Sequence, residues 1–138
     1  MQTMMGVQVG AGMRVALVVS RYHDFITDRL LEGALGALSH AGVGEEHITV
    51  VKVPGAFEVP FAARRLAADG GIDAVVCLGC LIRGATSHFD LIASAVAHGI
   101  TTASGETGVP MAFGVLTTNS AEEALERAQA GPSNKGWE

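Results

Sequence analysis

Hydrophobic residues along this chain follow two alternating patterns. Short, nearly continuous aliphatic runs, such as 15–19, are typical of strands that are buried on both faces of a parallel sheet. Between these runs, apolar residues recur every three to four positions, as in 30–38, which indicates amphipathic helices. Together the patterns predict strands at 14–20, 48–53, 73–81 and 110–116, and helices at 24–40, 58–68, 87–103 and from 121 to about 131.

This alternation of strands and helices predicts an α/β fold. Connections between parallel strands cross over a face of the sheet, so the sheet lies between two layers of helices. We therefore expect residues 1–138 to form a single domain, a three-layer αβα sandwich with a four-stranded parallel sheet. Residues 4–9 are predicted to form an additional short strand. Because it has no hairpin partner, we expect it to pair with the sheet edge of a neighbouring subunit.

The composition narrows the class of protein. A length of 138 residues is typical of one domain, and 49% hydrophobic against 17% charged residues excludes an intrinsically disordered chain. No apolar run approaches the ~18 residues that span a membrane, and the first residues lack the pattern of a secretory signal. The nine basic residues are scattered and the net charge is −5, which argues against nucleic-acid binding. The apolar excess, with 18 glycines, indicates either subunit interfaces or merely an alanine- and glycine-rich composition.

Two cysteines, Cys77 and Cys80, have the C-x-x-C spacing that is also found in redox motifs. They lie in an apolar run that predicts a buried strand, in which residues three positions apart point to opposite faces. The two sulfurs should therefore diverge too far for a disulfide, and no second cysteine pair completes a zinc site. We predict two free thiols, no metal, and a reducing, cytoplasmic environment.

The residues that could carry chemistry follow the predicted strands. Ligands of open parallel sheets bind beyond the carboxyl ends of the strands. Tyr22 follows the first strand, Glu58 the second, and an Arg-Gly turn with a histidine the third, at 83–88. Tyr22 is suited either to stack on a planar heterocycle or to cover the sheet edge. Glu58 is suited either to accept hydrogen bonds from ligand hydroxyls or to favour its helix N-terminus.

The segment after the third strand has two interpretations. Gly79 and Gly84 have the spacing of P-loop glycines, but Ala85 and Thr86 replace the required Lys-Ser/Thr pair, which argues against a nucleoside-triphosphate site. The free amides of the following helix could bind phosphate, or the segment is an ordinary strand-to-helix turn. His88 is either a solvated surface residue or an imidazole that the helix dipole keeps neutral, ready to transfer protons.

Five separated motifs resemble those of lumazine synthases. They are Ser20-Arg21-Tyr22, Gly55-Ala56-Phe57-Glu58-Val59-Pro60, Ile82-Arg83-Gly84-Ala85-Thr86-Ser87-His88-Phe89-Asp90, Gly114-Val115-Leu116-Thr117-Thr118 and Asn134-Lys135-Gly136. The resemblance implies a flavodoxin-like fold and a transferase that catalyses the penultimate step of riboflavin biosynthesis. That enzyme condenses 5-amino-6-(D-ribitylamino)uracil with 3,4-dihydroxy-2-butanone 4-phosphate, giving 6,7-dimethyl-8-ribityllumazine and phosphate. The resemblance implies that no cofactor and no metal are needed.

The resemblance also implies roles for individual residues. His88 would shuttle protons, and Arg127 would pair with the phosphate. The remaining substrate contacts would come from Tyr22 on the pyrimidine, the backbone of Ala56 and Phe57, Glu58 on the ribityl hydroxyls, Cys80, Leu81 and Ile82 along the pyrimidine slot, and Ala85 and Thr86 at the phosphate. Phe113, Arg127 and Lys135 would reach the same pocket from an adjacent subunit.

Several alternatives stay open at this point. The resemblance implies pentamers, either free or gathered into a 60-subunit icosahedral shell, with riboflavin synthase as a candidate partner. It also implies a further helix beyond Glu138. A non-catalytic flavin-binding or shell-forming relative would share the fold, although the presence of His88, Arg127 and Lys135 argues for catalysis. A phosphoacceptor signalling domain would need an acidic cluster at the strand ends, which this sequence lacks.

Overall fold

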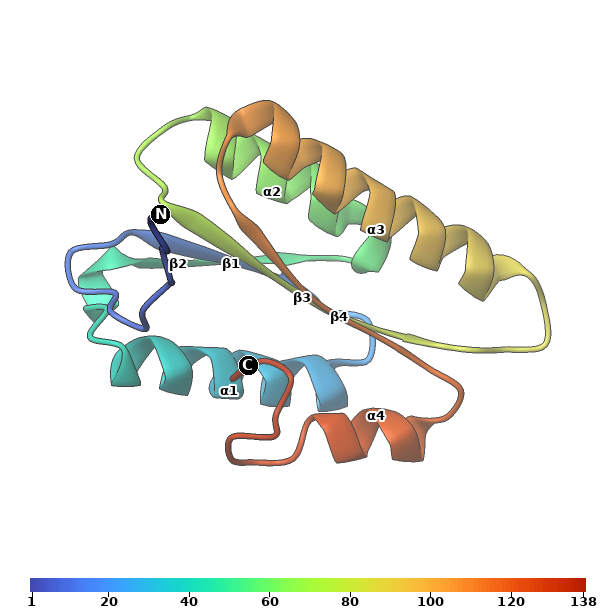
Figure 1. Ribbon diagram of the computed structural model, residues 1–138. Coiled ribbons are helices and arrows are strands. Elements are labelled where there is room, and N and C mark those ends of the chain that lie inside the picture. The colour runs from blue at the N-terminus through green and yellow to red at the C-terminus, as the bar shows by residue number, and fades with distance from the viewer.

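The computed structural model describes residues 1–138 and contains one sheet with helices on both faces (Figure 1). Its four strands are parallel and lie in the order β2-β1-β3-β4: β1 (Val15–Ser20), β2 (Ile48–Val53), β3 (Ala74–Ile82) and β4 (Met111–Thr118). Two helices cover each face: α2 (Val59–Ala68) and α3 (His88–Thr107) on one, α1 (Asp24–His40) and α4 (Ala121–Arg127) on the other. Short 3-10 helices precede β2 and α2: η1 (Glu45–His47) and η2 (Ala56–Glu58). The predicted αβα architecture is confirmed.

Strand β1 lies at the centre of the core, as its uninterrupted aliphatic run predicts. All six of its residues are buried. Ala16 and Val18 pack with residues of α2 and α3, whereas Leu17 and Val19 pack with residues of α1 and α4. Burying one such aliphatic side chain contributes about 1.5–3 kcal/mol, so β1 stabilises both halves of the core at once.

The two cysteines lie on opposite faces of β3, as predicted. Cys77 packs in the cluster under α2 and α3, and Cys80 packs in the cluster under α1 and α4. Both thiols are free and buried. Burial raises the pKa of Cys77 to about 12 and the pKa of Cys80 to about 11. The C-x-x-C spacing therefore belongs to a core strand, since neither sulfur can reach the other or ionise at neutral pH.

Two elements are longer than predicted. Helix α3 continues past residue 103 to Thr107, where Gly108 in the left-handed region (φ 72°) ends it. Strand β4 continues past residue 116 because its pairing with β3 extends to Ile82 and Thr118. Even α3, with 20 residues, lacks the apolar character to cross a membrane, and none of the other helices has it either.

Helix α4 begins as predicted but ends earlier. The Oγ of Ser120 accepts a hydrogen bond from the Glu123 N–H at 3.2 Å and so caps the first turn of the helix. The helix then ends at 127 rather than near 131. In a longer helix the carbonyl of Ala128 would accept from residue 132, but Pro132 has no N–H. The side-chain amide of Asn134 donates to this carbonyl instead, at 3.0 Å.

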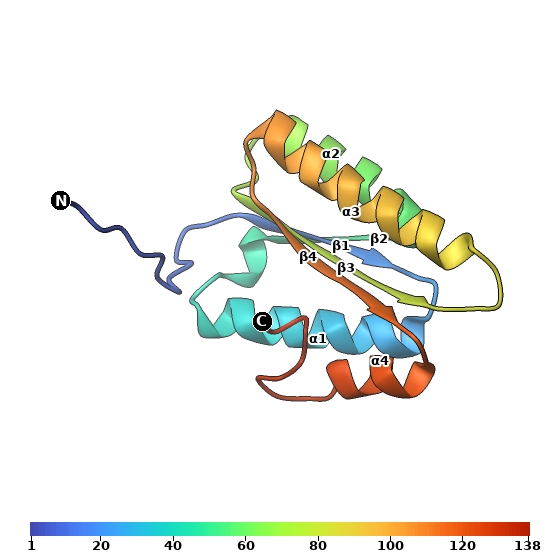
Figure 2. The ribbon, with the colours of Figure 1, turned by 45° about the vertical axis from the view of Figure 1, so that its right-hand side comes forward.

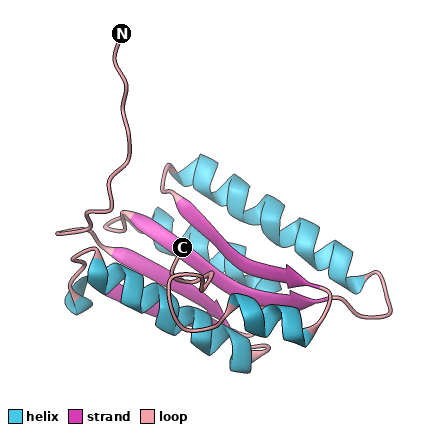
Figure 3. Cartoon of the chain, turned by 60° about the horizontal axis from the view of Figure 1, so that its bottom comes forward, coloured by secondary structure: helices cyan, strands magenta, loops and turns pink.

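The N-terminal arm, residues 1–9, forms no strand within the chain. It is exposed throughout and projects away from the sheet (Figures 2 and 3). The chain is first tied down at Gly10, whose N–H donates to the carbonyl of Ala41 at 2.8 Å. The arm has no pairing partner among residues of its own chain, so its pairing with a neighbouring subunit stays a prediction.

Candidate functional site

The carboxyl ends of the four strands meet at one edge of the sheet. The chain passes from β1 to β2 on one side of β1 and then returns to β3 on its other side. This reversal makes a topological switch point between β1 and β3, where open α/β sheets bind their ligands. The loops that border it are residues 21–23, after β1, and residues 83–87, after β3.

The loop after β1 presents Tyr22 at this edge. The Arg21 N–H donates to the Val53 carbonyl at 2.8 Å, and the Tyr22 N–H donates to the Pro54 carbonyl at 3.1 Å. This backbone is therefore fixed against β2, while the tyrosine side chain is 68% exposed. His23 has a left-handed backbone (φ 59°), and its ring lies 4.4 Å from the Tyr22 ring. Partial burial lowers the pKa of His23 below its ordinary value, which favours the neutral imidazole beside the tyrosine ring.

The turn after β2 brings a second group of predicted residues to the edge. Ala56 is buried, and its methyl lies next to Gly79 of β3, where a side chain would come within 3.6 Å of it. Phe57 is 60% exposed. Glu58 is half-buried and makes no capping hydrogen bond to α2. Its carboxylate oxygens are thus available to hydroxyl donors.

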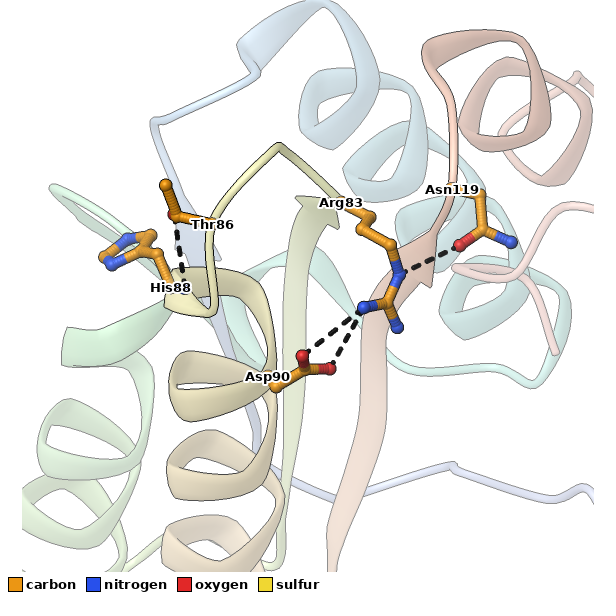
Figure 4. A network of polar contacts seen from close by, with 5 residues as sticks. All are labelled: Arg83, Thr86, His88, Asp90 and Asn119. Atoms are coloured by element: carbon orange, nitrogen blue, oxygen red, sulfur yellow. Dashed lines mark hydrogen bonds and ion pairs between the residues drawn. The ribbon is translucent and has the colours of Figure 1, made fainter.

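Arg83 joins the loop after β3 to helix α3 and to the loop after β4 (Figure 4). Its Nε donates to the Asn119 Oδ1 at 3.2 Å, and its Nη1 donates to both carboxylate oxygens of Asp90 at 3.2 and 3.3 Å. The guanidinium also lies 4.5 Å from the centre of the Phe89 ring. No local pattern in the sequence indicates these contacts, because Asn119 is 36 residues away from Arg83 along the chain. The hydrogen bond from Arg83 to Asn119 thus connects the loops that follow β3 and β4.

Thr86 and His88 lie on the opposite side of that loop from Arg83 (Figure 4). The Thr86 Oγ1 accepts a hydrogen bond from the His88 N–H at 3.4 Å. Ser87 precedes the helix without capping it, and Ala85, Thr86 and His88 are exposed. An uncapped helix start attracts anions, because its amides and the positive end of its dipole point outward. The arrangement can hold an anion beside an accessible proton-transfer group.

The last residues of β3 lie below this loop. Leu81 is half-buried and packs on the α2–α3 side, and Ile82 is half-buried and packs on the α1–α4 side. The sulfur of Cys80 is enclosed in the core of the α1–α4 side. Of the three residues expected along a pyrimidine slot, Leu81 and Ile82 retain accessible side-chain surface.

Charged residues surround a hollow of about 350 Å³ beside Tyr22. Its lining consists of Arg21, Tyr22, Asp24, Asp28, Lys52 and Pro54. The Lys52 Nζ pairs with the Asp28 carboxylate at 3.1 Å, which neutralises one charge of each sign. Nowhere in the chain are three or more His, Cys, Asp or Glu side chains grouped so as to hold a metal ion.

Phe113, Arg127 and Lys135 form a separate group along β4. They line a hollow of about 470 Å³, and Phe113 is 50% exposed. The Lys135 N–H donates to the Arg127 carbonyl at 2.9 Å, so the two cationic residues are joined through their backbones. The Lys135 Nζ is paired with the Glu138 carboxylate at 2.6 Å. We call Arg127 and Lys135 the cationic pair.

Within one chain the two groups of predicted residues stay apart. Phe113 is paired with Cys77, whereas the strands reach the site edge at Ile82 and Thr118, five residues further on. At about 3.3 Å per residue this places Phe113 roughly 17 Å from the edge along β4. Strand β4 is also the outer strand of the sheet, so the Phe113 group faces outward. The predicted site residues of one chain therefore form two separate groups, each a candidate for part of a site.

A match to a known protein family covers nearly the whole chain. The model of the family described as 6,7-dimethyl-8-ribityllumazine synthase matches residues 12–138. The matched region contains every strand and helix of the fold and both groups of site residues. It leaves out the first 11 residues, which include the whole exposed N-terminal arm.

Proposed function

Because the chain belongs to the 6,7-dimethyl-8-ribityllumazine synthase family, we propose that it forms 6,7-dimethyl-8-ribityllumazine in riboflavin biosynthesis. The substrates are 5-amino-6-(D-ribitylamino)uracil and 3,4-dihydroxy-2-butanone 4-phosphate. The observation that carries the proposal is the start of α3 at the β1–β3 switch point, where Ser87 makes no capping hydrogen bond and Thr86 and His88 are both exposed. This location suits a phosphate-bearing substrate that must also exchange protons.

The pyrimidine substrate fits the residues at the sheet edge. Tyr22 stacks on the planar ring, and Leu81 and Ile82 line the slot beside it. The backbone of η2 at Ala56 and Phe57 supplies polar groups. Glu58 accepts hydrogen bonds from the ribityl hydroxyls with the carboxylate oxygens that α2 does not use.

The reaction joins the substrates through two carbon–nitrogen bonds. The 5-amino nitrogen attacks the ketone, and loss of water gives an imine. Loss of a proton from the neighbouring carbon then expels phosphate. The enol that this elimination leaves tautomerises to a new ketone. The ribitylamino nitrogen attacks that ketone, and loss of another water closes the ring. His88 transfers protons in these steps, a role that typically contributes ~10²–10⁴-fold, and much of the remaining rate comes from holding two substrates together.

The phosphate group is expected to bind at a composite site. Ala85 and Thr86 offer the start of α3, and Phe113 with the cationic pair approaches from an adjacent subunit, Arg127 contributing a planar fork of donors. The outward position of β4, the half-exposed Phe113 and the free N-terminal arm support this assembly. We propose a pentamer, free or within a 60-subunit shell that could hold riboflavin synthase.

Two measurements test these proposals. Mixing both substrates with the protein should give a green-fluorescent product, and a protein that binds the pyrimidine without forming product would instead be a non-catalytic relative. Light scattering should give the mass of a pentamer or of a shell. A stable monomer that still forms product would refute the composite site, because one chain keeps its two partial sites apart.

A further inference from the structure

A buried asparagine ties the last turn of the chain to the first helix. Asn134 is 2% exposed, and its Nδ2 donates to the Arg29 carbonyl of α1 at 3.2 Å and to the Ala128 carbonyl at 3.0 Å. Its Oδ1 accepts from the N–H groups of Gly136 at 2.7 Å and Trp137 at 3.3 Å. An asparagine amide has two donors and two acceptor positions, so all four are used.

Two glycines make room for this contact. A Cβ at Gly33 of α1 would overlap the amide oxygen of Asn134, and a Cβ at Gly136 would overlap the Leu30 carbonyl oxygen. The turn therefore lies directly on the backbone of α1, closer than other residue types allow. The asparagine sits between three backbone segments and fixes their separations.

Two of those segments carry the cationic pair. Ala128, whose carbonyl Asn134 holds, directly follows Arg127, and Gly136, whose N–H it holds, directly follows Lys135. The direct hydrogen bond from the Lys135 N–H to the Arg127 carbonyl completes the connection. Both cationic side chains are exposed, and each makes one contact: Lys135 Nζ with the Glu138 carboxylate and Arg127 Nη1 with the Glu123 carbonyl at 3.4 Å. The backbone positions from which the two side chains extend therefore also decide where their charges lie.

We propose that Asn134 is a positioning residue that aims Arg127 and Lys135 at the phosphate of the butanone substrate. This inference rests on the proposed function, in which the cationic pair binds that phosphate. Asn134 touches no substrate and acts through the two cations. Its loss should therefore weaken use of the phosphate-bearing substrate and spare the pyrimidine, which contacts other elements.

The variant Asn134→Asp keeps the size and one acceptor oxygen but removes both N–H donors. A misplacement of about 1 Å can cost up to ~10²-fold, so we expect the KM for butanone phosphate to rise about 10- to 100-fold. The KM for the pyrimidine should change less than about twofold. Inorganic phosphate should lose potency as an inhibitor in parallel. Equal increases of both KM values would overturn the proposal.

A double-mutant cycle separates positioning from a general loss of stability. If Asn134 acts through the cationic pair, Asn134→Asp should add less than about twofold to the KM for butanone phosphate when Arg127 and Lys135 are already alanine. A full additional effect in that background would contradict the inference.

Gly33→Ala tests the same contact without removing the asparagine, because its methyl pushes on the Asn134 amide. Gly36→Ala is the matched control: it adds the same methyl on the same helix but meets only the Trp137 ring, at 3.2 Å. We expect the selective KM increase for Gly33→Ala alone, with both variants folded by circular dichroism. If Asn134→Asp does not fold, Gly33→Ala carries the test. A wild-type chain that forms no product refutes the proposed function, whereas an active wild type with unselective variants refutes the role of Asn134.

Discussion

Cys77 and Cys80 should be almost inert towards thiol reagents in the folded protein. The thiolate is the form that reacts, and at pH 7.5 an ordinary thiol of pKa 9.0 is about 3% ionised. Raising the pKa to about 11 for Cys80 lowers the thiolate fraction about 100-fold, and raising it to about 12 for Cys77 lowers it about 1000-fold. Steric enclosure slows the reaction further, since both residues are at most 1% exposed.

The assay is the absorbance change when a disulfide reagent such as 5,5′-dithiobis(2-nitrobenzoate) reacts with the native protein. Native protein should react at least about 100-fold more slowly than the same protein unfolded in guanidinium chloride, where both thiols become ordinary. Single Cys77→Ala and Cys80→Ala variants assign the residual rates, and the thiol of Cys80 should be the faster. A native chain that reacts as quickly as the unfolded one, or an intact mass 2 Da low from an internal disulfide, would refute the placement of the two sulfurs.

The remaining predictions concern catalysis and stability. His88→Ala should lower turnover ~10²–10⁴-fold without abolishing it, measured by product fluorescence, and unchanged turnover would remove the imidazole from the mechanism. Arg127→Ala should raise the KM for the phosphate-bearing substrate at least about tenfold more than the KM for the pyrimidine, and equal changes would make the guanidinium structural. Ser120→Ala should lower the free energy of unfolding by about 1 kcal/mol in denaturant titrations, because it removes the acceptor for the Glu123 N–H, and a neutral result would mean that this cap contributes nothing. Stability should also fall as the pH rises from 9 towards 11–12, since the two raised thiol pKa values favour the folded state only while both thiols are protonated.

The strands could be predicted closely because the hydrophobicity of their residues reflects which faces of each strand are buried. Strand β1 is buried on both sides, so its aliphatic run is uninterrupted and its bounds follow. Strand β4 lies at the edge, and its last residues, Thr117 and Thr118, carry no apolar signal. Only their pairing with β3 shows that they continue the strand. Local pattern therefore ends β4 two residues too early, although it places the other edge strand, β2, at its observed bounds.

Contacts between distant residues could not be predicted in the same way. The Asn134 amide meets the Arg29 carbonyl across 105 residues, and the hydrogen bond from Arg83 to Asn119 crosses 36. Nothing in the neighbourhood of either residue in the sequence specifies its partner. The predicted end of α4, near residue 131, is too late for the same reason. A local pattern can indicate that Pro132 lacks an N–H, but it cannot indicate that the Asn134 side chain donates to the Ala128 carbonyl instead.

The motifs located the residues of the candidate site but not their arrangement in one chain. The motifs place Tyr22, Glu58 and His88 after successive strands, whose carboxyl ends share one edge of the parallel sheet. The distance of Phe113 from that edge depends on its register against Cys77, which the sequence pattern does not give. The position of His23 beside Tyr22 could not be predicted, because nothing in the sequence indicates that its backbone is left-handed.

The long reach of Asn134 also sets the order in which the molecule can form. Helix α1 and strand β1 lie early in the chain, whereas Asn134 lies near its end. The hydrogen bond from Asn134 to the Arg29 carbonyl joins residues that are 105 positions apart. Contacts of such high sequence separation slow folding, and we expect this one to form after the local elements. A nascent chain can therefore present the loop that carries His88 before the cationic pair is in place. We therefore expect the backbone positions of the cationic pair to be among the last features of the fold to become ordered.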